Sequence, residues 1–173
     1  RNIDKAKALS SIIKADNDKS IRCIILTGSD NKAFVAGADI KEFASFDVAS
    51  GEDLARRGQE LLFDLLENLG TPSIAAINGF ALGGGLELAM ASHIRIASEN
   101  AKMGLPEVSL GLIPGYGGTQ RLANLVGKGK AIEMITTASM LSAHEAKEWG
   151  LVNYVCTQEE LISVAEKIAL NII

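Results

Sequence analysis

Metal-binding and nucleophilic residues are scarce in this sequence of 173 residues, which has two cysteines and two histidines. Cys23 and Cys156 lie far apart in the chain, so they form neither a disulfide framework nor a CxxC metal pattern. His93 and His144 are too few for a transition-metal site, and we expect both to have structural roles. No GxSxG segment occurs, which argues against a serine hydrolase. We therefore predict no metal site, and the candidate catalytic groups must be of other types.

An excess of basic charge and long apolar runs are also lacking. Lysine and arginine number 17 against 21 aspartates and glutamates, which gives a net charge of −4. This balance provides no broad basic surface for nucleic acid or for an anionic membrane. No run approaches the roughly 18 apolar residues of a membrane-spanning helix. With 47% hydrophobic and 22% charged residues, the chain has the composition of one globular domain.

Short apolar runs alternate with segments of helical periodicity along the chain. Apolar residues that recur every three or four positions predict helices, and short apolar runs bounded by Gly, Asn or Pro predict strands. We expect helices near residues 6–13, 54–69, 86–90, 120–126 and 131–137, strands at 23–26, 73–77, 93–97 and 151–156, and loops at 31–43 and 104–118. This alternation predicts an α/β fold with a mainly parallel sheet covered by helices.

Capping patterns predict the start of the helix at 54–69 and of two further helices. In a capping box, a Ser or Thr at the N-cap is followed three residues later by an acidic residue, and the two side chains bind each other's backbone N–H groups. The pattern occurs, in looser form for the first pair, at Ser50 with Asp53, at Ser142 with Glu145 and at Thr157 with Glu160.

Glu87 follows three consecutive glycines, residues 83–85, at the start of a predicted helix. A glycine turn that leads into a helix leaves backbone N–H groups unpaired and lets a ligand approach the main chain. The segment is therefore a candidate cradle for an anion or an oxyanion. A purely structural interpretation is also open, because an acidic residue near a helix N-terminus is favoured by about 0.3 to 1 kcal/mol.

Two nucleotide-binding motifs can be excluded by position. A dinucleotide-binding loop that begins at Gly83 needs glycine or alanine where Leu88 stands. A Walker loop that ends at Lys128 needs glycine and Ser or Thr where Leu122 and Gly129 stand. The glycine-rich segments therefore do not predict a nucleotide-binding domain of either kind.

Glu107 is a second acidic residue among apolar neighbours, between Pro106 and Val108. Burial disfavours the charged form of a carboxyl group, and this is how a carboxylic acid becomes a proton donor near neutral pH. Glu87 and Glu107 could thus share acid and base roles. A solvated loop residue is the alternative for Glu107, and the spacing in the sequence does not place the two glutamates face to face.

Several segments in a fixed order resemble the crotonase (enoyl-CoA hydratase/isomerase) superfamily, and in particular its enoyl-CoA hydratases. They are AGADIK at 36–41, ING at 77–79 with ALGGGLELA at 81–89, and LPE at 105–107 followed by GLIPG at 111–115 and GGTQRL at 117–122. The resemblance covers nearly the whole chain. It implies a crotonase-like fold of repeated ββα units over residues 1–173, without the N-terminal strands and the C-terminal trimerisation helices of full-length members.

The resemblance also implies roles for individual residues. The backbone N–H groups of Ala38 and Gly84 would form an oxyanion hole for the thioester carbonyl. Glu87 would hold the attacking water and help to deprotonate it, and Glu107 would exchange the proton at Cα. Gly115 matches a position near that water.

Substrate contacts follow from the same resemblance. Lys32 would contact a phosphate of coenzyme A, and the loop 36–41 would contact its adenine and pantetheine parts, through Ala36, Gly37, Ala38, Asp39, Ile40 and Lys41. Coenzyme A belongs to the substrate, so no separate cofactor is expected. The implied partners are an acyl-CoA thioester and further copies of the chain in a homotrimer or a dimer of trimers, with neither nucleic acid nor membrane. The implied location is the bacterial cytoplasm or the mitochondrial matrix.

The expected reaction is the reversible addition of water to trans-2-enoyl-CoA, which gives 3-hydroxyacyl-CoA. A double-bond isomerase of the same superfamily is one alternative, and the presence of both glutamates argues against it as the main activity. A non-catalytic acyl-CoA-binding or RNA-associated protein is another, because one fold hosts several functions. The sequence leaves the preferred acyl-chain length open.

Overall fold

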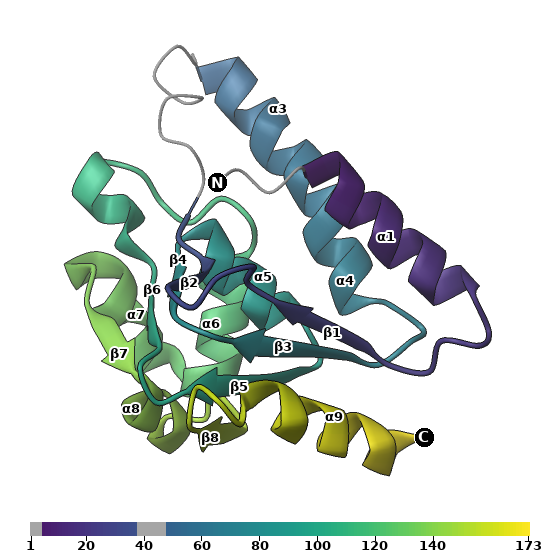
Figure 1. Ribbon diagram of the computed structural model, residues 1–173. Helices are drawn as coiled ribbons and strands as arrows, with labels where there is room; N and C mark the ends of the chain where they lie inside the picture. Colours follow the sequence, from purple (N-terminus) through teal and green to yellow (C-terminus); the bar gives the residue numbers. More distant parts are fainter. Residues whose placement is uncertain (1–4, 38–47) are drawn as a thin grey trace.

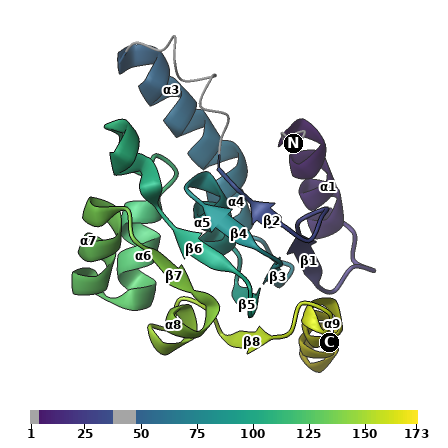
Figure 2. The ribbon, with the colours of Figure 1, turned by 60° about the vertical axis from the view of Figure 1, so that its left-hand side comes forward.

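Two four-stranded sheets form the centre of the molecule in the computed structural model, which describes residues 5–37 and 48–173 (Figure 1). The first sheet has the strand order β1 (Ile24–Thr27), β3 (Ser73–Ile77), β5 (Ile94–Ser98) and β8 (Tyr154–Cys156), and all its pairs are parallel. The second has the order β2 (Ala33–Val35), β4 (Phe80–Leu82), β6 (Lys102–Gly104) and β7 (Met140–Ser142), and only the β6–β7 pair is antiparallel (Figure 2).

The chain alternates between the two sheets. A strand of the first sheet is followed by one of the second and then by helical structure, as in β1–β2–α3, β3–β4–α5 and β5–β6–α6. The predicted α/β class and the repeated ββα units are therefore confirmed. The sequence analysis expected one sheet and missed the second: β2 lies inside the predicted loop 31–43, and β4, β6 and β7 were not predicted.

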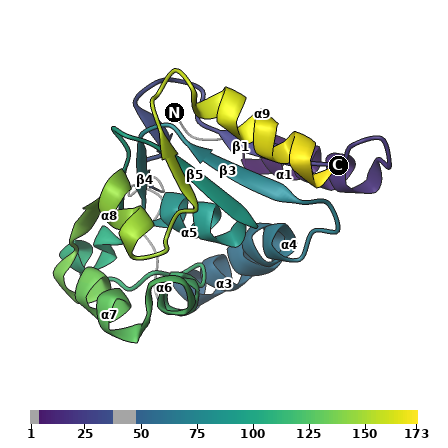
Figure 3. The same ribbon diagram turned by 90° about the horizontal axis from the view of Figure 1, so that it is seen from below.

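Helices cover both faces of the first sheet. The long helix α9 (Leu161–Ile172) packs on one face, where Ala165 contacts Ile74 and Ile96 in a shared apolar cluster (Figure 3). On the other face lie α1 (Lys5–Asn17), α4 (Asp64–Glu67) and α5 (Gly84–Ala91). All five residues of β3 are buried, as expected for a central parallel strand covered on both sides.

The helix predicted at 54–69 forms, with an unexpected local geometry. It begins as α3 (Val48–Gly58), passes through a π-helical turn, η1 (Gln59–Phe63), and ends in α4. Because α3 already begins at Val48, Ser50 lies inside the helix and the capping box predicted at Ser50 is wrong. π-Helical turns of this kind are frequent at functional sites, and this one faces the residues described below.

The remaining elements follow the predictions closely. The helices α6 (Gly118–Val126) and α7 (Lys128–Thr137) form as expected, and the predicted loop 104–118 contains a 3₁₀ helix, η2 (Pro106–Leu110). Ser142 and Glu145 form a complete capping box at the start of α8 (Ala143–Glu148). Thr157 and Glu160 contact each other at 2.9 Å in the turn before α9, so this pair begins the turn rather than the helix. His93 has the expected structural role, because its Nδ1 accepts the backbone N–H of Ser73 at 3.0 Å.

Candidate active site

The three glycines form the sharp turn between β4 and α5. Gly83 has φ of +54°, a conformation that L side chains rarely adopt. A Cβ at Gly85 would lie 1.9 Å from the carbonyl oxygen of Val35, so β2 can pack on the start of α5 only if residue 85 is glycine. Gly84 is the first residue of α5, where the backbone N–H groups have no acceptor within the helix. The turn thus places the first N–H groups of α5 between two closely packed elements, and the predicted oxyanion cradle at this turn stays a prediction.

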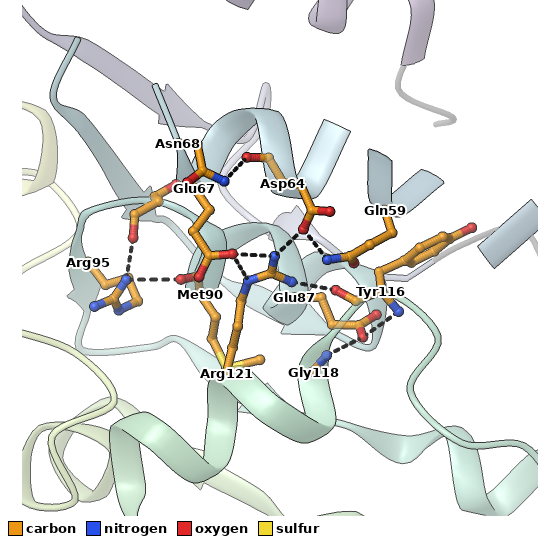
Figure 4. A network of polar contacts seen from close by, with 11 residues as sticks. Gln59, Asp64, Glu67, Asn68, Glu87, Met90, Arg95, Tyr116, Gly118 and Arg121 are labelled. Carbon is orange, nitrogen blue, oxygen red and sulfur yellow. Dashed lines mark hydrogen bonds and ion pairs between the residues drawn. The ribbon is translucent and has the colours of Figure 1, made fainter. Parts of the chain in front are cut away.

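Glu87 lies in the first turn of α5 and is only 1% exposed. Its Oε1 accepts hydrogen bonds from the backbone N–H groups of Tyr116 and Gly118, both at 2.8 Å (Figure 4). Burial raises the pKa of Glu87 to about 7 and the nearby charge of Glu107 adds to this, while the two backbone hydrogen bonds and the charge of Arg121 oppose it. Glu87 is therefore held firmly and able to exchange a proton near neutral pH.

Glu107 lies at the start of η2 and approaches the same glycine turn. A Cβ at Gly83 would be 2.9 Å from its Oε1, and a Cβ at Gly84 would be 4.0 Å from Oε2 of Glu87. The Oε2 atom of Glu107 is buried without a hydrogen-bond partner among the residues that the structure describes. Burial raises the pKa of Glu107. The structure therefore brings the two glutamates to one glycine turn, which the sequence alone did not settle.

The segment that follows β2 begins beside this turn. Gly37 has φ of +110°, and a Cβ there would lie 3.6 Å from the carbonyl oxygen of Leu82, the last residue of β4. Ala36 precedes it and is exposed. The other predicted residues of this loop, Ala38, Asp39, Ile40 and Lys41, lie outside the described residues.

Lys32 and Gly115 contact other parts of the molecule. Lys32 is exposed in the turn before β2, where its backbone N–H donates to Oδ1 of Asp30 at 2.8 Å. Gly115 is exposed beside α3, with its Cβ position 3.8 Å from Cβ of Ala55. Gly115 directly precedes Tyr116, whose N–H donates to Glu87. It is therefore the chain neighbour of a residue that contacts this glutamate.

Sequence reasoning missed Arg121, although its GGTQRL segment had been noted. Arg121 is 7% exposed, and its guanidinium donates to Oε2 of Glu67 from Nε and Nη2 at 3.0 and 2.6 Å, and to Oδ1 of Asp64 at 3.2 Å. Its Nη1 donates to the carbonyl oxygen of Tyr116 at 2.6 Å (Figure 4). No local pattern could have shown this, because Glu67 stands 54 positions before Arg121.

The sequence did not point to Tyr116 either. Its aromatic ring packs next to the glycine turn. The ring stacks on Phe63 with centroids 4.6 Å apart and planes at 10°. A Cβ at Gly84 would lie 3.6 Å from the ring, and a Cβ at Gly58 would lie 2.3 Å from it, so glycine at position 58 makes room for the ring beneath α3. An aromatic side chain in this place limits the space beyond the glycine turn.

Two other kinds of site are absent from the described residues, 5–37 and 48–173. They contain no group of three or more His, Cys, Asp or Glu side chains arranged to hold a metal ion. No helix among them is long and apolar enough to cross a membrane.

Comparisons with known protein families, sequences and structures agree with one another. The family model described as enoyl-CoA hydratase/isomerase matches residues 6–173. A short-chain-enoyl-CoA hydratase of Clostridium acetobutylicum is 48% identical over 99% of this chain and 66% of its own length, and a crotonyl-CoA hydratase of Syntrophomonas wolfei is 47% identical over 94% and 62%. The crystal structure of an enoyl-CoA hydratase from Bacillus anthracis aligns with a TM-score of 0.90 at 43% identity, over 98% of this chain and 67% of that one. The chain thus spans just under two thirds of the length of these curated relatives.

Proposed function

Because the chain belongs to the enoyl-CoA hydratase/isomerase family, we propose that it contributes the catalytic site of an enoyl-CoA hydratase. The reaction adds water across the double bond of a trans-2-enoyl-CoA and gives a 3-hydroxyacyl-CoA. The observation that carries the proposal is the approach of two carboxyl groups, the buried Glu87 and the half-buried Glu107, to one glycine turn. The hydratase names of the most similar relatives support it.

In the proposed mechanism Glu87 activates the water. Its Oε1 is occupied by two backbone N–H groups, so the other oxygen, Oε2, takes a proton as the water oxygen bonds to Cβ of the substrate. Glu107 delivers a proton to Cα from its protonated form, which burial favours because it raises the pKa of this carboxyl group. One turnover leaves Glu87 protonated and Glu107 ionised, and exchange with solvent restores the starting state.

Negative charge builds on the thioester oxygen during this addition. We propose that the backbone N–H groups of Gly84 and Ala38 stabilise it as an oxyanion hole. The position of Gly84 at the first residue of α5 supports its role, since that N–H has no acceptor within the helix. Loss of one such donor typically costs about 2.7 to 4 kcal/mol of transition-state stabilisation.

The rest of the substrate would extend from this turn. We propose that Ala36 to Lys41 contact the adenine and pantetheine parts of coenzyme A and that Lys32 contacts a phosphate, with no cofactor other than the substrate's own coenzyme A. The start of this loop beside Leu82 supports the first contact. The stacked pair of Tyr116 and Phe63 supports a preference for short acyl chains, because it fills space next to Gly84.

Assembly into a homotrimer or a dimer of trimers is part of the proposal. Val108, Leu110, Leu112 and Ile113, in and after η2, are 41 to 76% exposed. Such a row of exposed apolar side chains is typical of a protein interface. Light scattering coupled to size exclusion on the full-length protein measures the mass directly, and a monomer would contradict this part of the proposal.

A hydration assay tests the proposed reaction. The full-length protein is mixed with crotonyl-CoA in H₂¹⁸O, and the loss of enoyl-thioester absorbance is followed together with the mass of the product. We expect 3-hydroxybutyryl-CoA that carries one ¹⁸O atom. Double-bond migration without ¹⁸O would favour the isomerase alternative, and binding without turnover would favour a non-catalytic acyl-CoA-binding protein.

A further inference from the structure

Arg121 and Glu87 are linked through the backbone of a single residue, Tyr116. The N–H of Tyr116 donates to Oε1 of Glu87 at 2.8 Å, and its carbonyl oxygen accepts from Nη1 of Arg121 at 2.6 Å (Figure 4). Gly118, the second donor to Glu87, lies two residues further along the same loop. Because Tyr116 takes part in both contacts, a displacement of this residue would affect the bond to Arg121 and a bond that holds Glu87.

The loop is rich in glycine, so contacts with neighbouring groups help to fix its conformation. Residues 115, 117 and 118 are glycines, which lose the most conformational freedom when ordered, and Gly117 has φ of +82°. A Cβ at Gly117 would lie 2.3 Å from Nη1 of Arg121, so the guanidinium packs directly on the glycine backbone. Arg121 therefore both fills the space under the loop and binds its carbonyl group.

Carboxylates anchor the guanidinium from the opposite side. Glu67 accepts two hydrogen bonds on its Oε2 and Asp64 accepts one, and both residues belong to α4. Gln59, from the π-helical turn, donates to the same oxygen of Asp64. A planar guanidinium can bind two carboxylates and a carbonyl group at once, which a lysine ammonium on a single flexible chain does less well.

A second buried arginine has no such link to the site. Arg95 is 6% exposed, and among the described residues its side chain donates to the backbone carbonyl groups of Met90, Ser92 and Leu151. These bonds join the end of α5 to the segment before β8. Arg95 therefore provides a matched control for the loss of a buried guanidinium.

We infer that Arg121 is a positioning residue for Glu87: pinned to α4, it fixes the Tyr116 carbonyl group so that the N–H groups of Tyr116 and Gly118 keep the Glu87 carboxylate aimed at the substrate. This inference rests on the proposed hydratase function for its kinetic part. Its structural part concerns Glu87 in the free protein and can be tested without substrate.

The experiment compares Arg121→Gln, Arg121→Lys and Glu67→Gln with Arg95→Lys in the full-length protein. We expect Arg121→Gln to lower kcat 10- to 100-fold with KM changed less than 3-fold. The charged groups that act on Glu87 are Glu107 from η2 and Arg121 from α6, so loss of Arg121 and of the ordered amide bonds should raise the pKa of Glu87 and move the acidic limb of kcat/KM to higher pH. Arg121→Lys should recover part of the activity, and Glu67→Gln should change both quantities in the same direction by less.

Carbon-13 NMR of the Glu87 carboxyl group provides the reading that does not depend on activity. An upward shift of its pKa in Arg121→Gln and Arg121→Lys, absent in Arg95→Lys, would support the inference even if the protein hydrated no enoyl-CoA. The Arg121 variants could instead lose thermal stability while the pKa of Glu87 and the acidic limb of kcat/KM stay unchanged. This result would overturn the inference, because Arg121 would then have a structural role only. If Arg121→Gln does not fold, Arg121→Lys and Glu67→Gln decide the question by the same two readings.

Discussion

Glu87 and Glu107 approach the same glycine turn from very different surroundings. Glu87 is buried in the first turn of a helix, and two backbone N–H groups hold one of its oxygens. Glu107 is half-buried in a 3₁₀ helix, and its buried Oε2 has no hydrogen-bond partner among the described residues. The fold thus holds one oxygen of the first carboxylate, and in the proposed mechanism the bound substrate would complete the surroundings of the second. In the proposed mechanism, the firmly held Glu87 suits a base that binds the attacking water, and the less constrained Glu107 suits an acid that donates a proton to Cα.

The largest expected effect comes from Glu87→Gln. The amide oxygen of glutamine can still accept from Tyr116 and Gly118, so the geometry should persist while the base is lost. We expect kcat for crotonyl-CoA hydration to fall about 10³- to 10⁴-fold, the upper part of the range for a positioned base. Circular dichroism should match wild type. Activity within 10-fold of wild type would remove Glu87 from the mechanism.

Glu107→Gln should have a smaller effect of about 10²- to 10³-fold on kcat. Its half-buried position lets a water replace part of its proton transfer, which the enclosed position of Glu87 does not allow. Exchange of the Cα hydrogen of 3-hydroxybutyryl-CoA with D₂O, followed by NMR, should slow to the same extent. Unchanged Cα exchange with slower hydration would show that Glu107 acts elsewhere.

Gly118→Ala perturbs Glu87 without changing its chemistry. The new Cβ would lie 2.7 Å from Oε1 of Glu87, so the carboxylate must move and lose its two backbone donors. We expect a 10- to 100-fold loss of kcat. Gly129→Ala is the matched control, since nothing lies within 4 Å of its Cβ position in α7, and it should leave activity unchanged. Equal activity in the two variants would contradict the role given to this hydrogen bonding.

A further expected effect is on stability, and it follows the titration of Glu87 with pH. Burial raises the pKa of Glu87 from its ordinary value of 4.5 to about 7. Between these values the folded protein binds more protons than the unfolded chain, so stability falls as pH rises and levels off above about 7. Glu87→Gln removes this loss, which amounts to roughly 3 kcal/mol. Urea unfolding at pH 5 and pH 8 should show the variant gaining relative to wild type at pH 8. An equal difference at both pH values would contradict the buried charge.

Much of the fold could be predicted from the sequence because the first sheet and the long helices carry clear patterns. Segments such as β3 are continuous apolar runs, and the leucines of residues 54–69 repeat at helical spacing. The second sheet was missed because β2, β4, β6 and β7 have three residues each. Three residues are too few to show the alternation that identifies a strand.

The residues of the candidate site likewise include some that local sequence patterns reveal and others that they do not. Glu87, Glu107 and the glycine turn at residues 83–85 were chosen from local cues, an acidic residue among apolar neighbours and a glycine turn before a helix, whereas Gly84 was singled out within the turn by the family resemblance. The donors to Glu87 could not be found in this way, because they are backbone groups 29 and 31 positions away. Arg121 was hidden for a related reason: its partners lie on α4, and only the packing of α6 against that helix brings them together.

The most direct test of the account is the pKa of Glu87 measured by carbon-13 NMR in the wild type and in Glu107→Gln. The two carboxylates share one turn, so removing the charge of Glu107 should lower the pKa of Glu87 from its wild-type value of about 7. A wild-type value near 4.5, or a raised value that does not respond to Glu107→Gln, would contradict the convergence of the two groups on a single substrate.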